Sequence, residues 1–314
     1  MNILLTGGAG FIGSHIADAY LASGHRVTII DNLATGRRKN VPANAVFVEA
    51  DIRDPDAVRR VFASGRFDLV NHHAAQMDIR RSVADPVYDA SVNILGVLTI
   101  LQEAVRTGVP RIVFASSGGA AYGEQTSFPA SESHPTHPIS PYGVAKLTTE
   151  QYLFYYHTVF GLDVVCLRYA NVFGPRQNPE GEAGVVAIFA NKLFAGQQPV
   201  INGDGKQTRD YVFVSDVVRA NMLVSDARGF QVFNIGTGRE TDVNHLFTVI
   251  RGAVGSDCPE RHAEAKKGEQ LRSVLAHTKI KSELGWSPSV SLEEGLTRTV
   301  DYFRNALKAG GPTR

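Results

Sequence analysis

The sequence has few cysteines, no long apolar stretch and no signal-peptide pattern. Only two cysteines, Cys166 and Cys258, occur among 314 residues, which excludes a disulfide framework and favours a reducing compartment. No apolar run reaches the roughly 18 residues that a membrane span needs. The first residues, Met1–Thr6, lead directly into glycines without the apolar region and cleavage site of a secreted precursor. We therefore expect a cytoplasmic protein.

The sequence also has no excess of charge of either sign. Lys and Arg number 32 and Asp and Glu number 31, which gives a net charge of +1. This balance provides no general attraction for nucleic acid, so we expect a small-molecule substrate and neither a nucleic acid nor a membrane as partner. His72 and His73 suggest a metal ligand pair, but neighbouring residues of a strand point to opposite faces. No cysteine or acidic cluster accompanies them, so we predict no metal site and interpret them as packing residues in the wall of a cofactor pocket.

Short β-branched runs alternate with helical segments through the first half of the chain. Because the strands are apolar on both faces, this alternation predicts a doubly wound parallel α/β sheet, a Rossmann fold. The expected strands are Asn2–Thr6, Arg26–Ile30, Ala45–Val48, Asp68–His72, Arg111–Ser116 and Asp163–Arg168. The expected helices are Phe11–Ser23, Asp54–Ala63, Asn93–Thr107 and Tyr142–Phe160.

The pattern changes near Asn171, where Pro and Gly become frequent. One later buried run, Val232–Ile235, is expected to rejoin the sheet. The length predicts about two domains. We expect a dinucleotide-binding domain over residues 1–170, rejoined by a segment near 212–238, and a smaller interleaved substrate-binding domain over 171–211 and 239–314.

A glycine-rich turn follows the first expected strand and opens the first expected helix. Glycines stand at positions 7, 10 and 13, in the spacing Gly-x-x-Gly-x-x-Gly. A tight turn of this kind lets the backbone approach a pyrophosphate, and the helix start offers free N–H groups to it. In this strand–turn–helix context the motif predicts dinucleotide binding.

Asp31 closes the second expected strand, 18 residues after Gly13. A carboxylate there accepts hydrogen bonds from both adenosine ribose hydroxyls and repels a 2′-phosphate, which favours NAD over NADP. The basic run Arg37–Lys39 either meets a 2′-phosphate, which would favour NADP, or forms a solvated loop. Asp51 and Ile52 follow the third expected strand. They either hold the edge of adenine or cap the helix that begins after Asp54.

Tyr142 and Lys146 form a Tyr-x-x-x-Lys pair one helical turn apart, so both side chains lie on one helix face. The ordinary pKa of tyrosine, about 10, is too high for a base at neutral pH. A lysine cation close by favours the phenolate. Ser116 and Ser117 end the fifth expected strand, where a hydroxyl either relays a proton to Tyr142 or caps a turn.

Together these motifs resemble the extended short-chain dehydrogenase/reductase superfamily and, within it, the nucleotide-sugar epimerases, most closely the UDP-glucose 4-epimerase family. The second-half motifs that carry the resemblance are the segments Leu167–Gln177 and Gly203–Tyr211. The similarity extends over nearly the whole chain, from Thr6 to Leu284–Pro288. It implies an isomerase that inverts carbon 4 of a UDP-sugar through a transient 4-keto intermediate, with tightly held NAD.

Three alternatives stay open within and beyond this resemblance. A UDP-glucuronate 4-epimerase needs a group for the sugar carboxylate, and Arg176 is a candidate. A sugar-nucleotide dehydratase is disfavoured, because Gly118 and Gly119 stand where the family's dehydratases have Asp-Glu. An NAD-binding sensor without activity predicts a damaged catalytic pair, whereas Tyr142 and Lys146 are intact.

The resemblance also implies roles for single residues. Tyr142 is the base, Lys146 binds the nicotinamide ribose and Ser117 is the hydroxyl residue, one position before Gly118, where the family usually has it. The implied NAD site consists of Gly7, Gly10, Phe11, Ile12, Gly13, Asp31, Asn32, Asp51, Ile52, Ala74, Ala75, Gln76, Asn93, Ser116, Tyr142 and Lys146. The implied nucleotide-sugar site consists of Ser117, Tyr142, Asn171, Arg209, Lys266, Glu269 and Ser273.

Within that second site, Asn171 and Arg209 are expected to hold the UDP diphosphate, for which a guanidinium fork is well suited. Lys266 stands where the family often has an arginine, and a lysine still binds phosphate as a point charge. Glu269 is expected to accept hydrogen bonds from the uridine ribose. Ser273 is expected to border the 2-position of the sugar, so the small side chain predicts that N-acetyl sugars are accepted as well.

We also expect a homodimer. Two of the expected helices, Asn93–Thr107 and Tyr142–Phe160, carry more apolar residues than one core-facing stripe requires. These include Leu98, Leu101, Leu153, Phe154 and Phe160. Two such helices from each subunit can form a four-helix interface.

Overall fold

A computed structural model describes residues 1–179, 184–265 and 270–308. The chain divides into two compact units, each made of several segments. The first unit comprises residues 1–123, 135–169 and 217–233. The second comprises residues 124–134, 170–216 and 234–314. Segment 124–134, which the sequence pattern did not separate from the first domain, therefore belongs to the second unit.

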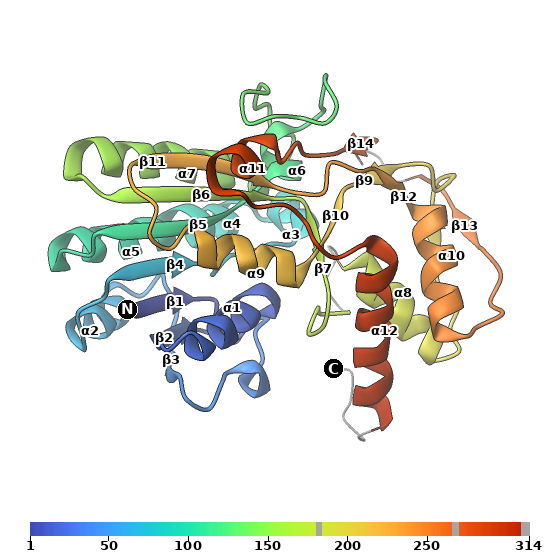
Figure 1. Ribbon diagram of the computed structural model, residues 1–314, viewed down its shortest axis with the longest axis horizontal. Helices are drawn as coiled ribbons and strands as arrows, with labels where there is room; N and C mark the ends of the chain where they lie inside the picture. Colours follow the sequence, from blue (N-terminus) through green and yellow to red (C-terminus); the bar gives the residue numbers. More distant parts are fainter. Residues whose placement is uncertain (180–183, 266–269, 309–314) are drawn as a thin grey trace. The chain divides into compact units, whose positions relative to one another are not determined.

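The first unit is built on a seven-stranded sheet with the order β11-β6-β5-β4-β1-β2-β3, and its neighbouring pairs from β6 to β3 are parallel (Figure 1). The strands are β1 (Asn2–Thr6), β2 (Arg26–Asp31), β3 (Val46–Glu49), β4 (Leu69–His72), β5 (Arg111–Ser117), β6 (Asp163–Tyr169) and β11 (Phe230–Ile235). The predicted doubly wound sheet is confirmed. The late buried run forms β11 at the sheet edge, as expected.

Helices cover both faces of this sheet (Figure 1). Apolar side chains of α2, α5 and α7 form one buried core with the strands, while α1 and α9 lie on the other face. The helical segments of this unit are α1 (Phe11–Ala22), η1 (Arg38–Asn40), α2 (Pro55–Ala63), α3 (Ile79–Ala84), α4 (Pro86–Ala90), η2 (Ser91–Leu95), α5 (Gly96–Thr107), α6 (Gly118–Tyr122), α7 (Pro141–Phe160) and α9 (Val214–Leu223).

Local sequence signals set the bounds of the longer helices. The Asp54 carboxylate accepts hydrogen bonds from the backbone N–H groups of Asp56 and Ala57 and so begins α2. Ser140 caps α7 in the same way, with Pro141 in the first helical position. The expected helix from Asn93 differs, because the turn around Asn93 is a π-helix, η2, that precedes α5.

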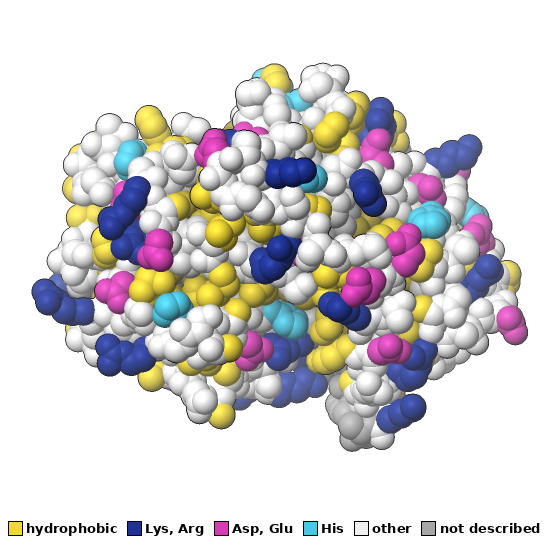
Figure 2. Space-filling view, in the orientation of Figure 1, with side chains coloured by type: hydrophobic (Ala, Val, Ile, Leu, Met, Phe, Trp, Pro, Cys, Tyr) yellow, Lys and Arg dark blue, Asp and Glu magenta, His cyan; other side chains and the backbone are white. Residues whose placement is uncertain are grey.

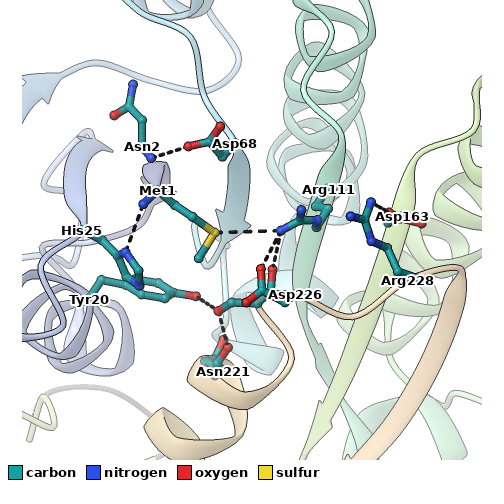
Figure 3. A network of polar contacts seen from close by, with 11 residues as sticks. Met1, Asn2, Tyr20, His25, Asp68, Arg111, Asp163, Asn221, Asp226 and Arg228 are labelled. Carbon is teal, nitrogen blue, oxygen red and sulfur yellow. Dashed lines mark hydrogen bonds and ion pairs between the residues drawn. The ribbon is translucent and has the colours of Figure 1, made fainter.

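Polar contacts fasten the returning segment 217–233 to the first unit (Figure 3). Arg111 on β5 donates a hydrogen bond to Asp226 over 2.9 Å. Arg228 bridges to Asp163 at the start of β6 over 3.0 Å. The hydroxyl of Tyr20 on α1 lies 3.0 Å from the Ser225 hydroxyl. Residues 217–233 thus supply polar partners to α1, β5 and β6, which explains why this late segment belongs to the first unit.

The second unit consists of short strands and four helices within the described residues. Its strands are β7 (Asn171–Phe173), β8 (Ile201–Asn202), β9 (Thr208–Arg209), β10 (Tyr211–Phe213), β12 (Thr241–Asp242), β13 (His262–Ala263) and β14 (Arg272–Ser273). Its helices are α8 (Val185–Phe194), α10 (Val243–Val254), α11 (Thr278–Leu284) and α12 (Leu292–Lys308). Segment 124–134 joins this unit through a bridge between Ala130 and Leu275.

The surface agrees with the balanced composition. Figure 2 shows basic and acidic side chains interspersed on the face that it presents. None of the helices in the described part of the chain is both long enough and apolar enough to span a membrane.

Candidate active site

The glycine turn after β1 forms a close backbone cradle. Gly7 has a φ of +71°, and a Cβ atom there would lie 2.6 Å from the backbone nitrogen of Ala74. A Cβ atom on Gly13 would collide with the carbonyl oxygen of Gly7. Gly10 precedes α1 and provides no side-chain cap, so the first N–H groups of the helix receive no capping side chain from it. A pyrophosphate fits such a site, because backbone N–H groups bind anions at helix starts.

Thr6 joins the carboxyl ends of β1 and β4 beside this cradle. Its hydroxyl accepts hydrogen bonds from the backbone N–H groups of His73 and Ala74, over 3.1 and 3.0 Å, and lies 3.0 Å from Nδ1 of His72. Burial lowers the pKa of His72 and of His73 to about 3, so both rings are neutral. The turn thus leads into the predicted passage over Ala74, Ala75 and Gln76.

Asp31 ends β2 with its carboxylate next to the glycine turn. Its two oxygens accept hydrogen bonds from the backbone N–H groups of Ala9, over 3.0 Å, and Leu33, over 2.8 Å. Each oxygen keeps a further lone pair for a ribose hydroxyl. Burial raises the pKa of Asp31, and these two hydrogen bonds oppose that rise. The arrangement fits the predicted ribose contact.

Asp51 lies in a cluster that includes an arginine the sequence reading did not single out. The guanidinium of Arg53 binds both carboxylate oxygens, over 2.9 and 2.7 Å, and Asn32 donates to one of them over 2.9 Å. These bonds lower the pKa of Asp51 to about 2. Because Asp54 caps α2, Asp51 is not needed as a cap. The neighbouring Ile52 is buried and would collide with any side chain at Gly96.

Gln76 and Asn93 are tied together at the predicted nicotinamide end. Asn93 Oδ1 accepts from the backbone N–H of Gln76 over 3.0 Å, and Asn93 Nδ2 donates to the carbonyl of Gln76 over 2.8 Å. The remaining hydrogen of that amide goes to Asp89 on α4, over 2.9 Å. The polar atoms of Asn93 therefore hold the Gln76 backbone in place, and direct contact of Asn93 with a cofactor stays a prediction.

The Tyr142–Lys146 pair lies on the first turns of α7. The ammonium group of Lys146 is 2.8 Å from the carbonyl oxygen of Ala115 and 5.7 Å from the Tyr142 ring centre. Burial lowers the pKa of Lys146 to about 8, while the Asp89 and Glu150 charges oppose this. Burial raises the pKa of Tyr142, the Asp89 charge adds to the rise, and a hydrogen bond with Ser117 lowers it. Positive charge near Tyr142 is therefore needed before it can act as a base.

The two serines at the end of β5 have different surroundings. Ser117 borders Tyr142 through the hydrogen bond just described and also begins α6, where its oxygen accepts from Ala120 N–H over 3.4 Å. Ser116 is buried and donates to Glu150 over 2.5 Å. The structure thus brings Ser117, and not Ser116, next to the tyrosine.

Next to Ser116 lies a buried ion pair that the sequence analysis did not predict. Arg168 on β6 donates to both oxygens of Glu150 on α7, from Nε over 3.0 Å and from Nη2 over 2.6 Å. A further nitrogen donates to the Tyr122 hydroxyl over 2.9 Å. Glu150 follows Lys146 by one helical turn, so a charged residue on the buried face of α7 was the available signal.

The second unit contains three described residues of the predicted nucleotide-sugar site. Arg209 on β9 and Ser273 on β14 are direct partners of two parallel strands. Asn171 begins β7, and its backbone N–H donates to the carbonyl of Asp210 over 2.9 Å. The carboxylate of Asp210 is buried against backbone N–H groups of Thr237, Gly238 and Leu275. The predicted Lys266 and Glu269 lie outside the described residues.

Comparisons with known proteins agree with this geometry. The model of the NAD dependent epimerase/dehydratase family matches residues 3–236. A UDP-glucose 4-epimerase of Mycolicibacterium smegmatis is 46% identical over 312 residues, which cover 97% of this chain and 99% of that one.

Solved structures show the same similarity. A UDP-glucose 4-epimerase of Thermotoga maritima, solved with UDP-glucose, has a TM-score of 0.96 and 49% identity, covering 98% of this chain and 100% of its own. One of Thermus thermophilus, solved with NAD, has a TM-score of 0.94 and 44% identity over the same shares. With a family model that spans most of the sequence and relatives that match it end to end, the chain belongs to the NAD-dependent epimerase/dehydratase family.

Proposed function

We propose that the protein is a UDP-glucose 4-epimerase, which interconverts UDP-glucose and UDP-galactose with NAD as a tightly held cofactor. The observation that carries this proposal is the intact Tyr142–Lys146 pair with Ser117 beside the tyrosine. The relatives named above support it, because they share nearly half of their residues with this chain over nearly its whole length.

In the proposed reaction Tyr142 takes the proton from the sugar 4-hydroxyl, and Ser117 relays protons between the sugar and the tyrosine. Lys146 favours the phenolate through its positive charge and holds the nicotinamide ribose. NAD held by the glycine turn, Asp31 and Lys146 would supply reversible hydride transfer at carbon 4 of the sugar. The 4-keto sugar must turn over between these two transfers, so binding energy is best placed on the nucleotide.

We propose that the first unit binds NAD and the second binds the nucleotide. In the second unit, Asn171 and Arg209 would hold the diphosphate, Lys266 would add a positive charge and Glu269 would bind the uridine ribose. Ser273, the strand partner of Arg209, would border the sugar. We also propose a cytoplasmic location, which the two free cysteines support, because thiols persist in reducing compartments.

The proposed function is tested by incubating the purified protein with UDP-glucose and no added NAD. We expect UDP-galactose to form until the two sugars reach equilibrium, because net redox is zero and the cofactor need not leave. UDP-glucuronate and dTDP-glucose serve as parallel substrates. Formation of a 4-keto-6-deoxy sugar instead would show a dehydratase, and no product from any substrate would favour a sensor.

Substrate breadth is a further prediction, and it depends on the small side chain at position 273. A serine leaves room for a substituent at the sugar 2-position, because acceptance needs only the absence of a clash. We expect UDP-N-acetylglucosamine to be epimerised, and Ser273→Tyr to reduce kcat/KM for this sugar more than for UDP-glucose. Ser273 is almost fully buried, so a thermal melt must first show that the tyrosine variant folds. Equal changes for both sugars would contradict the prediction.

A homodimer is likewise proposed, with a corrected set of surface residues. Leu101 and Leu153 are fully buried in the core of the first unit, so they cannot line an interface as the sequence suggested. Leu98 is partly buried against the same core. The exposed apolar side chains of α7 are Val144, Tyr152, Phe154, Tyr155, Val159 and Phe160, of which Phe154 and Phe160 were in the predicted set. An exposed patch of this kind is typical of a protein–protein contact.

Light scattering tests the dimer directly. We expect twice the chain mass for the wild type at micromolar concentration. Val159→Glu, which places a charge on the helix face shared by Tyr152 and Tyr155, should give a monomer, because burying an unpaired charge is costly. Val46→Glu is the matched control, since Val46 is also exposed but lies on β3. A wild-type monomer, or a dimer that Val159→Glu leaves unchanged, would overturn the proposal.

A further inference from the structure

Asp89 on α4 is a buried carboxylate whose charge is not balanced by any hydrogen-bonded cation among the described residues. Its Oδ1 accepts from Gln76 Nε2 and from Asn93 Nδ2, each over 2.9 Å. Its Oδ2 is buried and has no hydrogen-bond partner in the described part of the chain. Both partners are neutral amides, and Asp89 is only 1% exposed. Burial of such a carboxylate is costly unless positive charge lies near it.

Lys146 is the complementary case, a buried cation without an ion pair among the described residues. It is 4% exposed, and its ammonium group donates to the carbonyl of Ala115, which carries no net charge. Two carboxylates favour the charged form of this lysine, first Asp89 and then Glu150. Since Glu150 is already neutralised by the two-point ion pair with Arg168, Asp89 is the carboxylate left to balance Lys146. Burial raises the pKa of Asp89, and the hydrogen bonds from Gln76 and Asn93 and the charge of Lys146 oppose that rise.

The hydrogen bonds around Asp89 fix it relative to α7. The carbonyl oxygen of Asn93, in the π-helical turn η2, accepts a hydrogen bond from the Thr149 hydroxyl on α7 over 2.9 Å. Thr149 lies nearly one helical turn beyond Lys146. Gln76, which also donates to the carbonyl of Asp78, completes the cluster. Asp89 is therefore held in one position by both of its neighbours, as a fixed charge must be.

We propose that Asp89 is the counter-ion of Lys146, a positioning residue whose buried charge keeps the lysine in its ammonium form and whose Oδ1 holds Gln76 and Asn93. The same charge disfavours the phenolate of Tyr142. The base therefore forms readily only when further positive charge is present, as on the oxidised nicotinamide ring of bound NAD. The inference rests on the proposed roles of Tyr142 and Lys146 but not on the identity of the sugar.

Other titratable groups lie on the elements around Asp89. From α7, Tyr142, Lys146 and Glu150 are the groups that interact with it, and Arg168 on β6 is bound to Glu150. His72 at the end of β4 and His73 directly after it are both neutral. From α3, Arg81 has its guanidinium 4.0 Å from the ring centre of Tyr88 on α4. Removing the charge of Asp89 therefore changes the ionisation of both Lys146 and Tyr142.

The sign of the effect follows from the charges. With Asp89 present, the pKa of Lys146 is about 8. Burial lowers the pKa of Lys146, and the charge of Asp89 raises it. Without that charge the pKa falls further, so Lys146 loses its proton at a lower pH. Asp89 favours the protonated form of both Lys146 and Tyr142, so removing its charge lets the first proton leave at a lower pH whichever group releases it.

The experiment compares wild type with Asp89→Asn, which keeps an amide oxygen for Gln76 and Asn93 but removes the charge. The titration of Lys146 is followed by NMR of enzyme labelled with ¹³C at the lysine side chains and loaded with NAD. Lys146→Met identifies the signal. We expect the midpoint to fall by about one pH unit, a roughly tenfold change in the ionisation constant. The alkaline limb of the kcat profile should move with it.

Two controls separate charge from structure. Thr149→Val breaks the hydrogen bond between α7 and Asn93 without removing a charge. Asp89→Glu keeps the charge but lengthens the side chain by one methylene group. Both variants should retain the wild-type midpoint. If Asp89→Asn does not fold, Asp89→Ser, which leaves space for a water molecule, replaces it. An unmoved midpoint in the neutral variant, or an equal shift in either control, would overturn the inference. Because the titration needs no sugar, its result stands even if UDP-glucose proves not to be the substrate.

Discussion

Tyr142→Phe is expected to lower epimerase activity by about 10²–10⁴-fold, the usual contribution of a positioned acid–base group. The change removes the ionisable oxygen and keeps the ring that lies beside Lys146. Without the phenolate, the proposed base for the sugar 4-hydroxyl is lost. The measurement is kcat for UDP-glucose, together with the NAD released from denatured protein.

The cofactor measurement makes this prediction specific. NAD content should be close to that of the wild type, because the glycine cradle and Asp31 are untouched. Tyr155→Phe is the matched control, since it removes a hydroxyl from an exposed tyrosine of the same helix and should leave kcat unchanged. If Tyr142→Phe retained near-wild-type turnover, Tyr142 would not be the base.

Arg168→Met is expected to destabilise the protein by about 3–5 kcal/mol, the usual cost of leaving one partner of a buried ion pair alone. Arg168 and Glu150 are both buried, with side-chain exposures of 7% and 3%. The variant leaves the Glu150 carboxylate with the Ser116 hydroxyl, and it also removes the donor to Tyr122. Urea unfolding at fixed protein concentration measures the loss.

Two comparisons test the physical cause. Arg53→Met breaks the more exposed pair with Asp51, where side-chain exposures are 37% and 26%, and should cost no more than about 1 kcal/mol. The double variant Arg168→Met with Glu150→Leu should regain part of the lost stability, because no buried charge is then left unpaired. A loss for Arg168→Met as small as that for Arg53→Met would refute the prediction.

Much of the first unit could be predicted because its signals are local. Buried strands and amphipathic helices are encoded by side-chain periodicity, so the expected strands fall within one or two residues of β1 to β6. The glycine spacing predicted the dinucleotide turn correctly as a structural element, because a tight turn against the His73–Ala74 backbone leaves no room for a side chain at Gly7. The start of α5 was less well placed, because the π-helical turn at Asn93 depends on bonds to Gln76 and Thr149 rather than on local preference.

The sequence by itself determined the fold class, the dinucleotide motif and the Tyr142–Lys146 pair, since each depends on residues close together in the chain. Only the tertiary structure decided that Ser117 rather than Ser116 borders Tyr142, and that Leu101 and Leu153 belong to the core. It alone showed that Arg168 neutralises Glu150, whereas the Asp89 carboxylate accepts hydrogen bonds only from the neutral amides of Gln76 and Asn93 among the described residues. Whether a buried charge is balanced depends on groups from distant segments, and these meet only when β4, β6, α4 and α7 pack in one unit.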